Sequence, residues 1–417
     1  GNIGSYLFKY LIKNKDILSK KNNCIPNISY ISARNRGKKR GLKINKKKWL
    51  NNYLDATKKK DVDLIIELIG GAEGPAKKLV FSALRNNKHV ITANKALIAK
   101  YGDELSLIAE KNKVNLEFEA SVCGGVPIIR SLKEGLIANK IKKVFGIFNG
   151  TSNYILSSMD KMNKDFDEVL KKAKRLGYAE SNPSADLNGD DVSAKLKILS
   201  SLCFNSFLNN NVHVEGIKEI NKIDIDNANI LGYKIKLLGV AEQIDNKIYQ
   251  RVHPSLIKKN SYVAGVDGVL NAVLIEGSPV GQSVIQGEGA GPAATTSALV
   301  SDISSILRGN VKFPFSISNK ERKNLKFFDI TERFFSAYLR FEVIDRSGVL
   351  SNITNIFSKN NVSIKRLIQT PSKNSKRSSI VIITHNSKDK FLNKIIKLIS
   401  KKKYILKKPV LIRIDES

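Results

Sequence analysis

The chain has 417 residues, of which 42% are hydrophobic and 26% are charged, as in ordinary globular proteins. This length exceeds what a single hydrophobic core covers, so it predicts two to four domains. No run of about 18 apolar residues occurs, and we therefore expect neither a membrane-spanning helix nor a membrane partner. Three cysteines cannot form a disulfide framework, which together with the lack of a signal peptide indicates a cytoplasmic protein.

The charge is strongly basic: 71 lysine and arginine residues against 38 acidic residues give a formal net charge of +33. Either a basic nucleic-acid-binding protein or a lysine-rich composition spread over solvated faces explains this number. The lysines occur in scattered runs such as residues 46–48 and 401–403, without interleaved aromatic residues for base stacking. The pattern favours the second explanation. We therefore expect no nucleic-acid partner, although the charge would attract an anionic cofactor.

The first third of the chain, residues 1–127, alternates strand-like and helix-like segments. Short β-branched runs separated by helices predict an α/β domain with a parallel, doubly wound sheet of the Rossmann type. The expected elements are a helix at 5–13, a strand at 27–33, a strand within 61–71, a helix at 75–87, a strand within 89–95, a strand within 114–121 and a helix at 127–136.

The rest of the chain changes character twice. Residues 128–310 combine helices with longer strands, at 142–150, 231–244 and 271–277, which predicts an α+β domain on a mixed sheet. A helix at 292–308 closes this region, and we expect it to pack back on the first domain. Residues 311–336 lack periodicity and indicate a linker. Residues 337–417 follow the order strand, helix, strand, strand, helix, strand, which is the ferredoxin-like βαββαβ arrangement.

A glycine-containing turn opens the first helix. Gly1, Asn2, Ile3 and Gly4 match the end of a dinucleotide-binding G-x-G-x-x-G turn, in which glycines let the backbone approach a pyrophosphate. We expect the first strand of the sheet and the first glycine to precede residue 1. A helix start that merely contains glycine is the alternative.

The second predicted strand indicates which nicotinamide cofactor is preferred. NAD-binding domains usually carry an acidic residue after this strand, whereas this chain has Arg34 and the basic cluster Lys38–Arg40. Guanidinium and ammonium groups suit a 2′-phosphate. The sequence therefore favours NADP(H), with NAD(H) as the second choice, and a solvated basic loop remains the alternative.

Four stretches together closely resemble the homoserine dehydrogenase family: residues 67–99, 119–136, 149–204 and the QGEGAG segment at 286–291. The resemblance runs from residue 1 to about residue 308. It implies reversible NAD(P)H-dependent reduction of L-aspartate 4-semialdehyde to L-homoserine, in threonine, methionine and isoleucine biosynthesis. It also makes residues 1–127 the NAD(P)-binding domain and 128–310 the catalytic and dimerisation domain, and assigns Gly291 to the cofactor.

The residues that would carry this chemistry lie close together in the sequence. Reducing an aldehyde requires a hydride donor and an acid for the developing alkoxide. Asp191 and Lys195 are four residues apart, on one face if the segment is helical, although alone they would indicate an ordinary surface pair. The resemblance implies that Lys195 is the proton donor and also contacts the substrate, and that Asp191 positions it. It further implies that Glu180 and Asp186 bind the substrate, and that Lys95, at the carboxyl end of a strand, touches nicotinamide and substrate.

The segment between the two predicted domains suggests a cation site. By resemblance, a structural monovalent cation, Na⁺ or K⁺, is held mainly through backbone carbonyls of Glu119, Val122, Gly124 and Val126. Oxygen ligands of this kind suit a hard cation. Cys123, in the same segment, is expected to be a small core residue rather than a nucleophile.

The C-terminal segment at 337–370 resembles the ACT domain. Residues 345–350 form the turn from strand to helix, where Gly348 lets the backbone approach a ligand. The resemblance implies an amino-acid effector, threonine by the logic of the pathway, and a homodimer or homotetramer. A purely structural dimerisation module is the alternative for this segment, and a catalytically inactive threonine-sensing homologue is the alternative for the chain.

Overall fold

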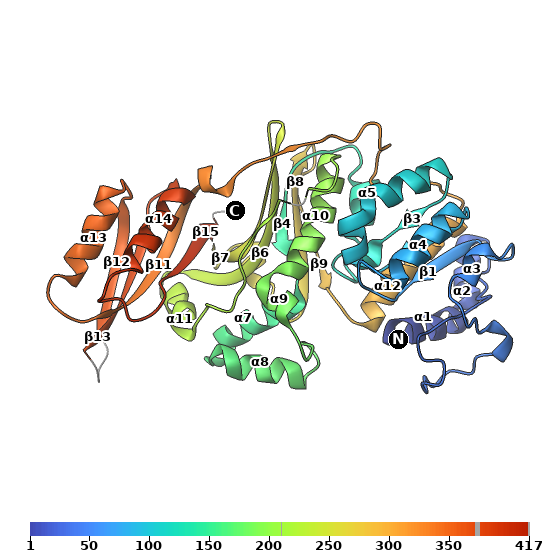
Figure 1. Cartoon of the computed structure of the whole chain (residues 1–417), viewed down its shortest axis with the longest axis horizontal. Coiled ribbons are helices and arrows are strands. Elements are labelled where there is room, and N and C mark those ends of the chain that lie inside the picture. Colours follow the sequence, from blue (N-terminus) through green and yellow to red (C-terminus); the bar gives the residue numbers. More distant parts are fainter. Residues whose placement is uncertain (210, 372–375, 416–417) are drawn as a thin grey trace.

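The computed structural model describes residues 1–209, 211–371 and 376–415. Figure 1 shows three parts side by side: an N-terminal α/β domain, a central domain built on long strands, and a C-terminal domain at the opposite end. Among the described helices, none combines the length and the apolar run that a bilayer crossing requires.

The N-terminal domain contains a parallel sheet in the order β1-β2-β3, flanked by helices. This confirms the predicted parallel α/β arrangement. Pro75 begins α4, where its missing N–H leaves no helical hydrogen bond unmade. The elements are α1 (Asn2–Lys13), α2 (Lys15–Asn22), α3 (Asp55–Lys58), β1 (Leu64–Glu67), α4 (Pro75–Arg85), β2 (His89–Thr92), α5 (Lys95–Lys111) and β3 (Leu116–Glu117).

The strand expected at 27–33 is wrong. Only Ile31 makes a β-bridge, to Trp49, through hydrogen bonds from Ile31 N to Lys48 O (2.7 Å) and from Leu50 N to Ile31 O (2.9 Å). A strand is stabilised by pairing along its whole length. In the described part of the chain, this single bridge is the only β-pairing of the run, so its β-branched pattern is not sufficient to form a strand.

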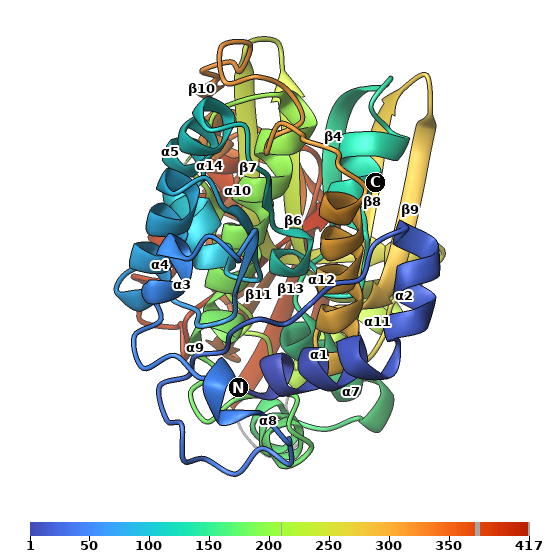
Figure 2. The same cartoon turned by 90° about the vertical axis from the view of Figure 1, so that its right-hand side faces the viewer.

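Helix α12 (Pro292–Leu307) follows the central domain in sequence but packs on the N-terminal one. Its Ala298, Leu299 and Ile303 share an apolar cluster with Leu7 and Leu11 of α1, and Ile91 of β2 belongs to the same cluster. Figure 2 shows α12 lying beside α1. The chain therefore crosses between these two domains twice, which fixes them to one another.

The central domain is built on an antiparallel sheet in the order β7-β6-β4-β8-β9. Two short strands, β5 and β10, add to β7 in parallel, so the sheet is mixed, as predicted. The elements are α6 (Ile128–Arg130), β4 (Lys140–Ile147), α7 (Gly150–Met162), α8 (Phe166–Arg175), α9 (Ser184–Asn188), α10 (Asp190–Phe204), β5 (His213–Val214), α11 (Lys222–Ile230), β6 (Tyr233–Ile244), β7 (Lys247–Lys258), β8 (Leu270–Ser278), β9 (Gly281–Glu288) and β10 (Lys326–Phe327).

The C-terminal domain has the strand order β12-β13-β11-β15 with antiparallel neighbours, which confirms the ferredoxin-like arrangement. Strand β15 also pairs in parallel with β7, so that one sheet of 12 strands, counted over the described residues, crosses from the central into the C-terminal domain. The elements are β11 (Phe334–Ile344), α13 (Val349–Lys359), β12 (Ile364–Pro371), β13 (Arg377–Thr384), β14 (Ser387–Lys388), α14 (Asp389–Ile399) and β15 (Val410–Asp415).

Residues 311–336 lead from α12 to the C-terminal domain, and part of this segment packs on the N-terminal domain. Phe315 is fully buried, with its ring centroid 5.4 Å from that of Phe118. The guanidinium of Arg322 lies 4.2 Å from the ring centroid of Phe315 and forms an ion pair with Asp103 at 2.6 Å. The connecting segment is therefore anchored to α5 and to the N-terminal core.

This anchoring can be measured by truncating Phe315. We expect Phe315→Ala to lower the free energy of unfolding by about 3 kcal/mol, because it removes a fully buried aromatic ring. Phe313→Ala is the matched control, since that side chain is 48% exposed and its loss should change stability by no more than about 0.5 kcal/mol. Urea unfolding followed by fluorescence makes the comparison, and equal losses for the two variants would contradict it.

Candidate active site

The site residues gather where α10 lies between the central sheet and α5 of the N-terminal domain (Figure 1). A sharp turn at Gly189 joins α9 to α10, with φ at 89°. A Cβ at this position would lie 3.1 Å from both Val214 and Val252, in a backbone conformation that side chains rarely adopt. Glycine here lets two helices that carry acidic residues meet at one point.

Asp191 lies at the centre of the site. Its Oδ2 is 2.8 Å from Nζ of Lys195, one turn later on α10, and its Oδ1 is 2.7 Å from Nζ of Lys95, the first residue of α5. Lys195 also donates a hydrogen bond to the carbonyl oxygen of Phe148 at 2.6 Å. One carboxylate thus binds two ammonium groups from different domains.

Asn149, which the sequence did not single out, joins the two aspartates. Its Nδ2 donates to Asp186 Oδ1 at 2.7 Å and to Asp191 Oδ2 at 2.8 Å. Its Oδ1 accepts a hydrogen bond from the backbone N–H of Ser152 at 2.8 Å and so caps α7. An asparagine followed by Gly-Thr-Ser is a typical helix start, which was the available signal.

The electrostatics of the cluster follow from burial and from these contacts. Burial opposes ionisation of Asp191, but the ammonium groups of Lys195 and Lys95 outweigh it and hold the pKa of the carboxyl well below its ordinary value. Burial likewise opposes charge on Lys195, and Asp191 raises the pKa of that ammonium above its usual range. Burial and repulsion from Asp191 raise the pKa of Asp186, against the hydrogen bond from Asn149. At neutral pH, Lys195 therefore carries a proton that it can donate.

The remaining predicted substrate residue lies apart from this cluster. Glu180 is exposed, in the turn that follows α8, and in the described part of the chain no hydrogen bond or ion pair involves its carboxylate. A hydrogen bond from Thr151 Oγ1 to Tyr178 O, at 2.7 Å, ties this turn to α7. The side chain of Lys95 is 40% exposed, whereas that of Lys195 is nearly buried. The structure thus brings Lys95, Asp186, Asp191 and Lys195 together and leaves Glu180 facing solvent.

A glycine loop lies at the carboxyl ends of β1 and β2, where ligands bind in open α/β sheets. The buried carboxylate of Glu67 accepts hydrogen bonds from the N–H groups of Ile69 and Gly70 and from the Thr92 hydroxyl. Asn94 donates to Gly71 O at 2.7 Å, which fixes the loop beside Lys95. The loop is thereby held next to the charged cluster.

The predicted pyrophosphate turn begins α1, with Gly1 as its N-cap residue. Gly4 lies beside the residue that follows β1, because a Cβ there would be 3.7 Å from Leu68 Cδ1. Asn2 and Ile3 occupy the first positions of the helix. The helix start therefore adjoins the carboxyl end of β1, which is the place that a dinucleotide phosphate requires.

The basic loop after residue 33 lies beside the same helix. Arg34 is exposed. A Cβ at Gly41 would lie 3.9 Å from Nζ of Lys9, which places this loop beside α1. A cavity of about 450 Å³ opens beside the loop, lined by Arg36, Lys38, Lys39, Arg40, Gly41, Leu42, Ile44 and Trp49. The sequence did not single out Trp49, whose ring has the guanidinium groups of Arg36 and Arg40 each 5.7 Å from its centroid.

The predicted cation loop has backbone oxygens to offer. The Glu119 carbonyl accepts a hydrogen bond from the N–H group three residues later, and the Val126 carbonyl accepts one from the N–H group two residues later. Those of Val122 and Gly124, both in buried residues, accept none from the described residues. Buried carbonyls are nearly always paired, so these two oxygens fit a bound cation. The described residues contain no cluster of three His, Cys, Asp or Glu side chains suited to a metal.

The side-chain carboxylate of Glu119, unlike its carbonyl, faces the start of α6. It accepts hydrogen bonds from the N–H groups of Ile129 (2.9 Å) and Arg130 (2.6 Å), at the start of α6. The loop also lies against the turn that leads to Gly291, the N-cap of α12, through a bond from Gly125 N to Glu288 O at 2.9 Å. Cys123 is fully buried, as predicted, and burial raises the pKa of its thiol to about 11.

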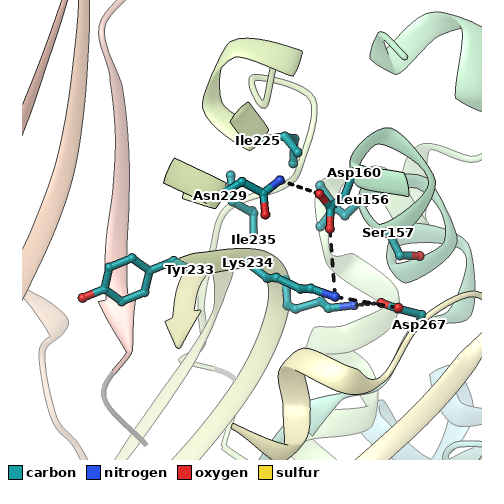
Figure 3. Close-up of a pocket in the computed structure, with 10 residues that line it drawn as sticks. Leu156, Ser157, Asp160, Ile225, Asn229, Tyr233, Lys234, Ile235 and Asp267 are labelled. Atoms are coloured by element: carbon teal, nitrogen blue, oxygen red, sulfur yellow. Dashed lines mark hydrogen bonds and ion pairs between the residues drawn. The ribbon is translucent and has the colours of Figure 1, made fainter. Parts of the chain in front are cut away.

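A second polar cavity lies between α7, α11 and β6 (Figure 3). Its volume of about 10 Å³ suits a single water molecule. Asp267 pairs there with Lys236 at 2.9 Å and with Lys234 at 3.8 Å, while Asn229 donates to Asp160. None of the predicted site residues lines this cavity, whose charges compensate one another.

Comparison with known proteins gives a consistent assignment. Residues 1–119 match the family model described as homoserine dehydrogenase, NAD binding domain, residues 127–304 match the homoserine dehydrogenase model, and residues 337–401 match the ACT domain. The homoserine dehydrogenase of Neisseria gonorrhoeae is 41% identical over 366 residues, which are 86% of this chain and 83% of that protein.

Solved structures agree with the sequence comparison. A homoserine dehydrogenase from Thiobacillus denitrificans superposes with a TM-score of 0.92 at 36% identity, over 100% of this chain and 96% of that one. A hyperthermophilic archaeal homoserine dehydrogenase in complex with NADPH superposes with a TM-score of 0.54 at 28% identity, over 61% of this chain and 74% of that one. The Thiobacillus denitrificans structure covers all three domains described above.

Proposed function

This chain belongs to the homoserine dehydrogenase family and is an NAD(P)-dependent oxidoreductase, and on that premise we propose that the cluster around Asp191 reduces L-aspartate 4-semialdehyde to L-homoserine. One observation carries the proposal: a single buried carboxylate binds two lysines from different domains, where the cofactor side meets the substrate side. Such a group of fixed charges at a domain junction is typical of a catalytic centre.

In this proposal Lys195 is the acid. When bound, the reduced nicotinamide supplies the hydride that adds to the aldehyde carbon. Lys195 donates its proton to the carbonyl oxygen as the negative charge develops there, so that the aldehyde becomes an alcohol. Asp191 keeps that lysine charged and aimed, since it holds Nζ at 2.8 Å.

The other residues handle the charged ends of the substrate. L-Aspartate 4-semialdehyde has an ammonium and a carboxylate, and the site offers both signs of charge. In this proposal Asp186, held by Asn149, and Glu180, which faces solvent apart from the cluster, bind the amino end and the oxygen that becomes the hydroxyl. The half-exposed Lys95 would contact both the substrate and the nicotinamide.

The alternative of an inactive threonine-sensing homologue has no observation in its favour. Loss of catalysis would be expected to affect the charged residues of the site first. Lys95 and Lys195 are present and both pair with Asp191, and Asn149 joins Asp191 to Asp186. A dehydrogenase is therefore the better account of this geometry.

We further propose that NADP(H) is preferred over NAD(H). The support is the basic loop, since Arg34 is exposed and Gly41, next to Arg40, lies beside Lys9 of α1. A guanidinium suits the 2′-phosphate that distinguishes the two cofactors. Gly1, Asn2, Ile3, Gly4, Lys95 and Gly291 would contact the remainder of the cofactor.

A structural monovalent cation, Na⁺ or K⁺, is part of the proposal. Its support is the pair of buried carbonyls of Val122 and Gly124, with those of Glu119 and Val126 in the same loop. A cation would neutralise these dipoles and stiffen the loop beside Gly291. Thermal unfolding in K⁺ or Na⁺ against tetramethylammonium at equal ionic strength tests this: an unchanged Tm would count against the site.

Regulation by threonine and assembly as a homodimer or homotetramer in the cytoplasm complete the proposal. The turn at Gly348, the N-cap of α13, is the place where an effector would bind. At the two ends of the described sheet, β9 pairs only with β8 and β12 only with β13, so both edges have backbone groups to offer another chain. Light scattering and initial rates with and without threonine test both points, and a monomer whose rate ignores threonine would refute them.

The function itself is tested by replacing the acid. We expect wild-type protein to consume NADPH with the semialdehyde, and Lys195→Met to lower kcat by about 100-fold or more, because general-acid assistance is lost. The dissociation constant for NADPH should not change. Lys171→Met, at an exposed lysine of α8, is the control and should behave as wild type. Full activity of a folded Lys195→Met protein would refute the assigned role.

Cofactor preference is tested in the basic loop. Arg34→Gln should raise the KM for NADPH by about 10-fold, the value of one charge-assisted hydrogen bond, and leave the KM for NADH unchanged. Lys43→Gln is the control, at another exposed cation of this loop. Arg40→Gln locates the contact: an effect there and none at Arg34 would move the assignment to Arg40. No effect at either position would contradict the preference for NADP(H).

A further inference from the structure

The edge of β7 that faces away from β6 is shared by three segments, namely β10, β5 and β15 of the C-terminal domain. Strand β5 pairs with it at His213↔Arg251 and Val214↔Val252. Strand β15 of the C-terminal domain pairs with it at 413↔255 through 415↔257, three residues further along. Figure 1 shows β15 running beside β7. The last strand of the C-terminal domain therefore continues the line of β5 along one edge.

An arginine on β15 reaches across to the residue that follows β5. Nη1 of Arg413 lies 2.9 Å from both carboxylate oxygens of Glu215. The same guanidinium donates from Nε to Asp389 Oδ1 at 2.6 Å and from Nη2 to Asp389 Oδ2 at 3.2 Å. The side chain of Arg413 is 1% exposed, and that of Glu215 is 35% exposed. His213 contacts Glu215 as well, at 2.6 Å. A buried, oriented cation thus fixes the carboxylate of a more exposed residue.

The segment after Glu215 is packed directly on the turn that carries the catalytic aspartates. Ile217 N donates to Leu187 O at 2.9 Å. A Cβ on Gly216 would overlap that same carbonyl oxygen, so the two backbones are in direct contact. Leu187 is the neighbour of Asp186, and Gly189, two residues before Asp191, rests on Val214.

We propose that Arg413 and Glu215 act together as positioning residues for Asp186 and Asp191, so that the C-terminal domain sets the geometry of the catalytic site. The inference rests on the proposed function. A shift of β15 along β7 moves the guanidinium, the guanidinium moves Glu215, and the backbone contact at Gly216 transmits that movement to the α9–α10 turn. Neither residue touches the substrate; each acts through the aspartates.

A second ion pair in the same protein provides a closely matched control. Arg340, on β11, is 2% exposed and is bound bidentately by buried Asp224, at 2.6 and 3.1 Å. It also pairs with Glu342 at 2.8 Å, whose side chain is 23% exposed and also contacts Lys407. Glu342 thus repeats the chemistry of Glu215, but its partners lie on β11 and just before β15, away from the α9–α10 turn.

The experiment compares Glu215→Gln with Glu342→Gln in the full chain. We expect Glu215→Gln to raise the KM for the semialdehyde by about threefold to tenfold and to lower kcat, because both aspartates shift; couplings of this kind typically have this size. The dissociation constant for NADPH should stay the same. Glu342→Gln should leave KM and kcat unchanged. Loss of folded protein alone would lower kcat with KM unchanged, so the KM separates positioning from stability.

Two further variants complete the test. Glu215→Asp keeps the charge and should restore most of the KM, including in the case that Glu215→Gln folds poorly. In an Asp186→Asn background, Glu215→Gln should have a smaller effect on KM than in wild type, because it acts through that aspartate. Equal KM values for Glu215→Gln, Glu342→Gln and an active wild type would overturn the inference. A wild type that fails to reduce the semialdehyde would instead refute the proposed function.

Discussion

The carboxylate of Asp191 pairs with two ammonium groups that belong to different domains, and the geometry of the site depends on it. Two like charges about 4 Å apart in a partly buried setting repel by about 4 kcal/mol, and burying the charge of Lys195 without a partner would cost several kcal/mol more. Lys95 and Lys195 can therefore share this position only with the aspartate between them. With Asp186 nearby, the cluster offers a zwitterionic substrate both signs of charge within one small region.

The position of Asp191 depends more on close backbone packing than on side-chain contacts. The α9–α10 turn requires glycine at 189, and the segment that supports it requires glycine at 216, because any side chain would push the two apart. Asn149 then fixes the aspartates from the other side while it caps α7. A substitution at any of these three positions would displace the charged groups without replacing any of them, and effects of an ångström on catalytic geometry are large.

The parts of this arrangement that depend on local spacing could be predicted from the sequence. The pairing of Asp191 with Lys195 follows from one helical turn, and Lys95 follows from its place after a parallel strand. The strand expected at 27–33 was wrong, because β-branched composition shows a tendency to pair but does not supply a partner. Asn149 was missed for a related reason: its amide meets Asp186 and Asp191 only after three helices have packed. The burial of Phe315 could not be predicted either, because hydrophobic periodicity identifies the buried face of a helix or strand. It does not identify a single buried side chain in an irregular segment.

The continuous sheet joins the C-terminal domain to the central domain. A domain attached only through residues 311–336 could move without consequence for the aspartates. Here, instead, β15 pairs with the same edge of β7 as β5, and the two hydrogen bonds between Asp389 and Arg413 fix the guanidinium that binds Glu215. Buried ion pairs of this kind add little net stability, because desolvation offsets much of the attraction, but they are highly directional. A directional contact where two parts of a sheet meet fixes the relative position of the residues it joins, even where it adds little stability. That is the property that a domain needs if its own ligand is to affect a reaction on another part of the chain.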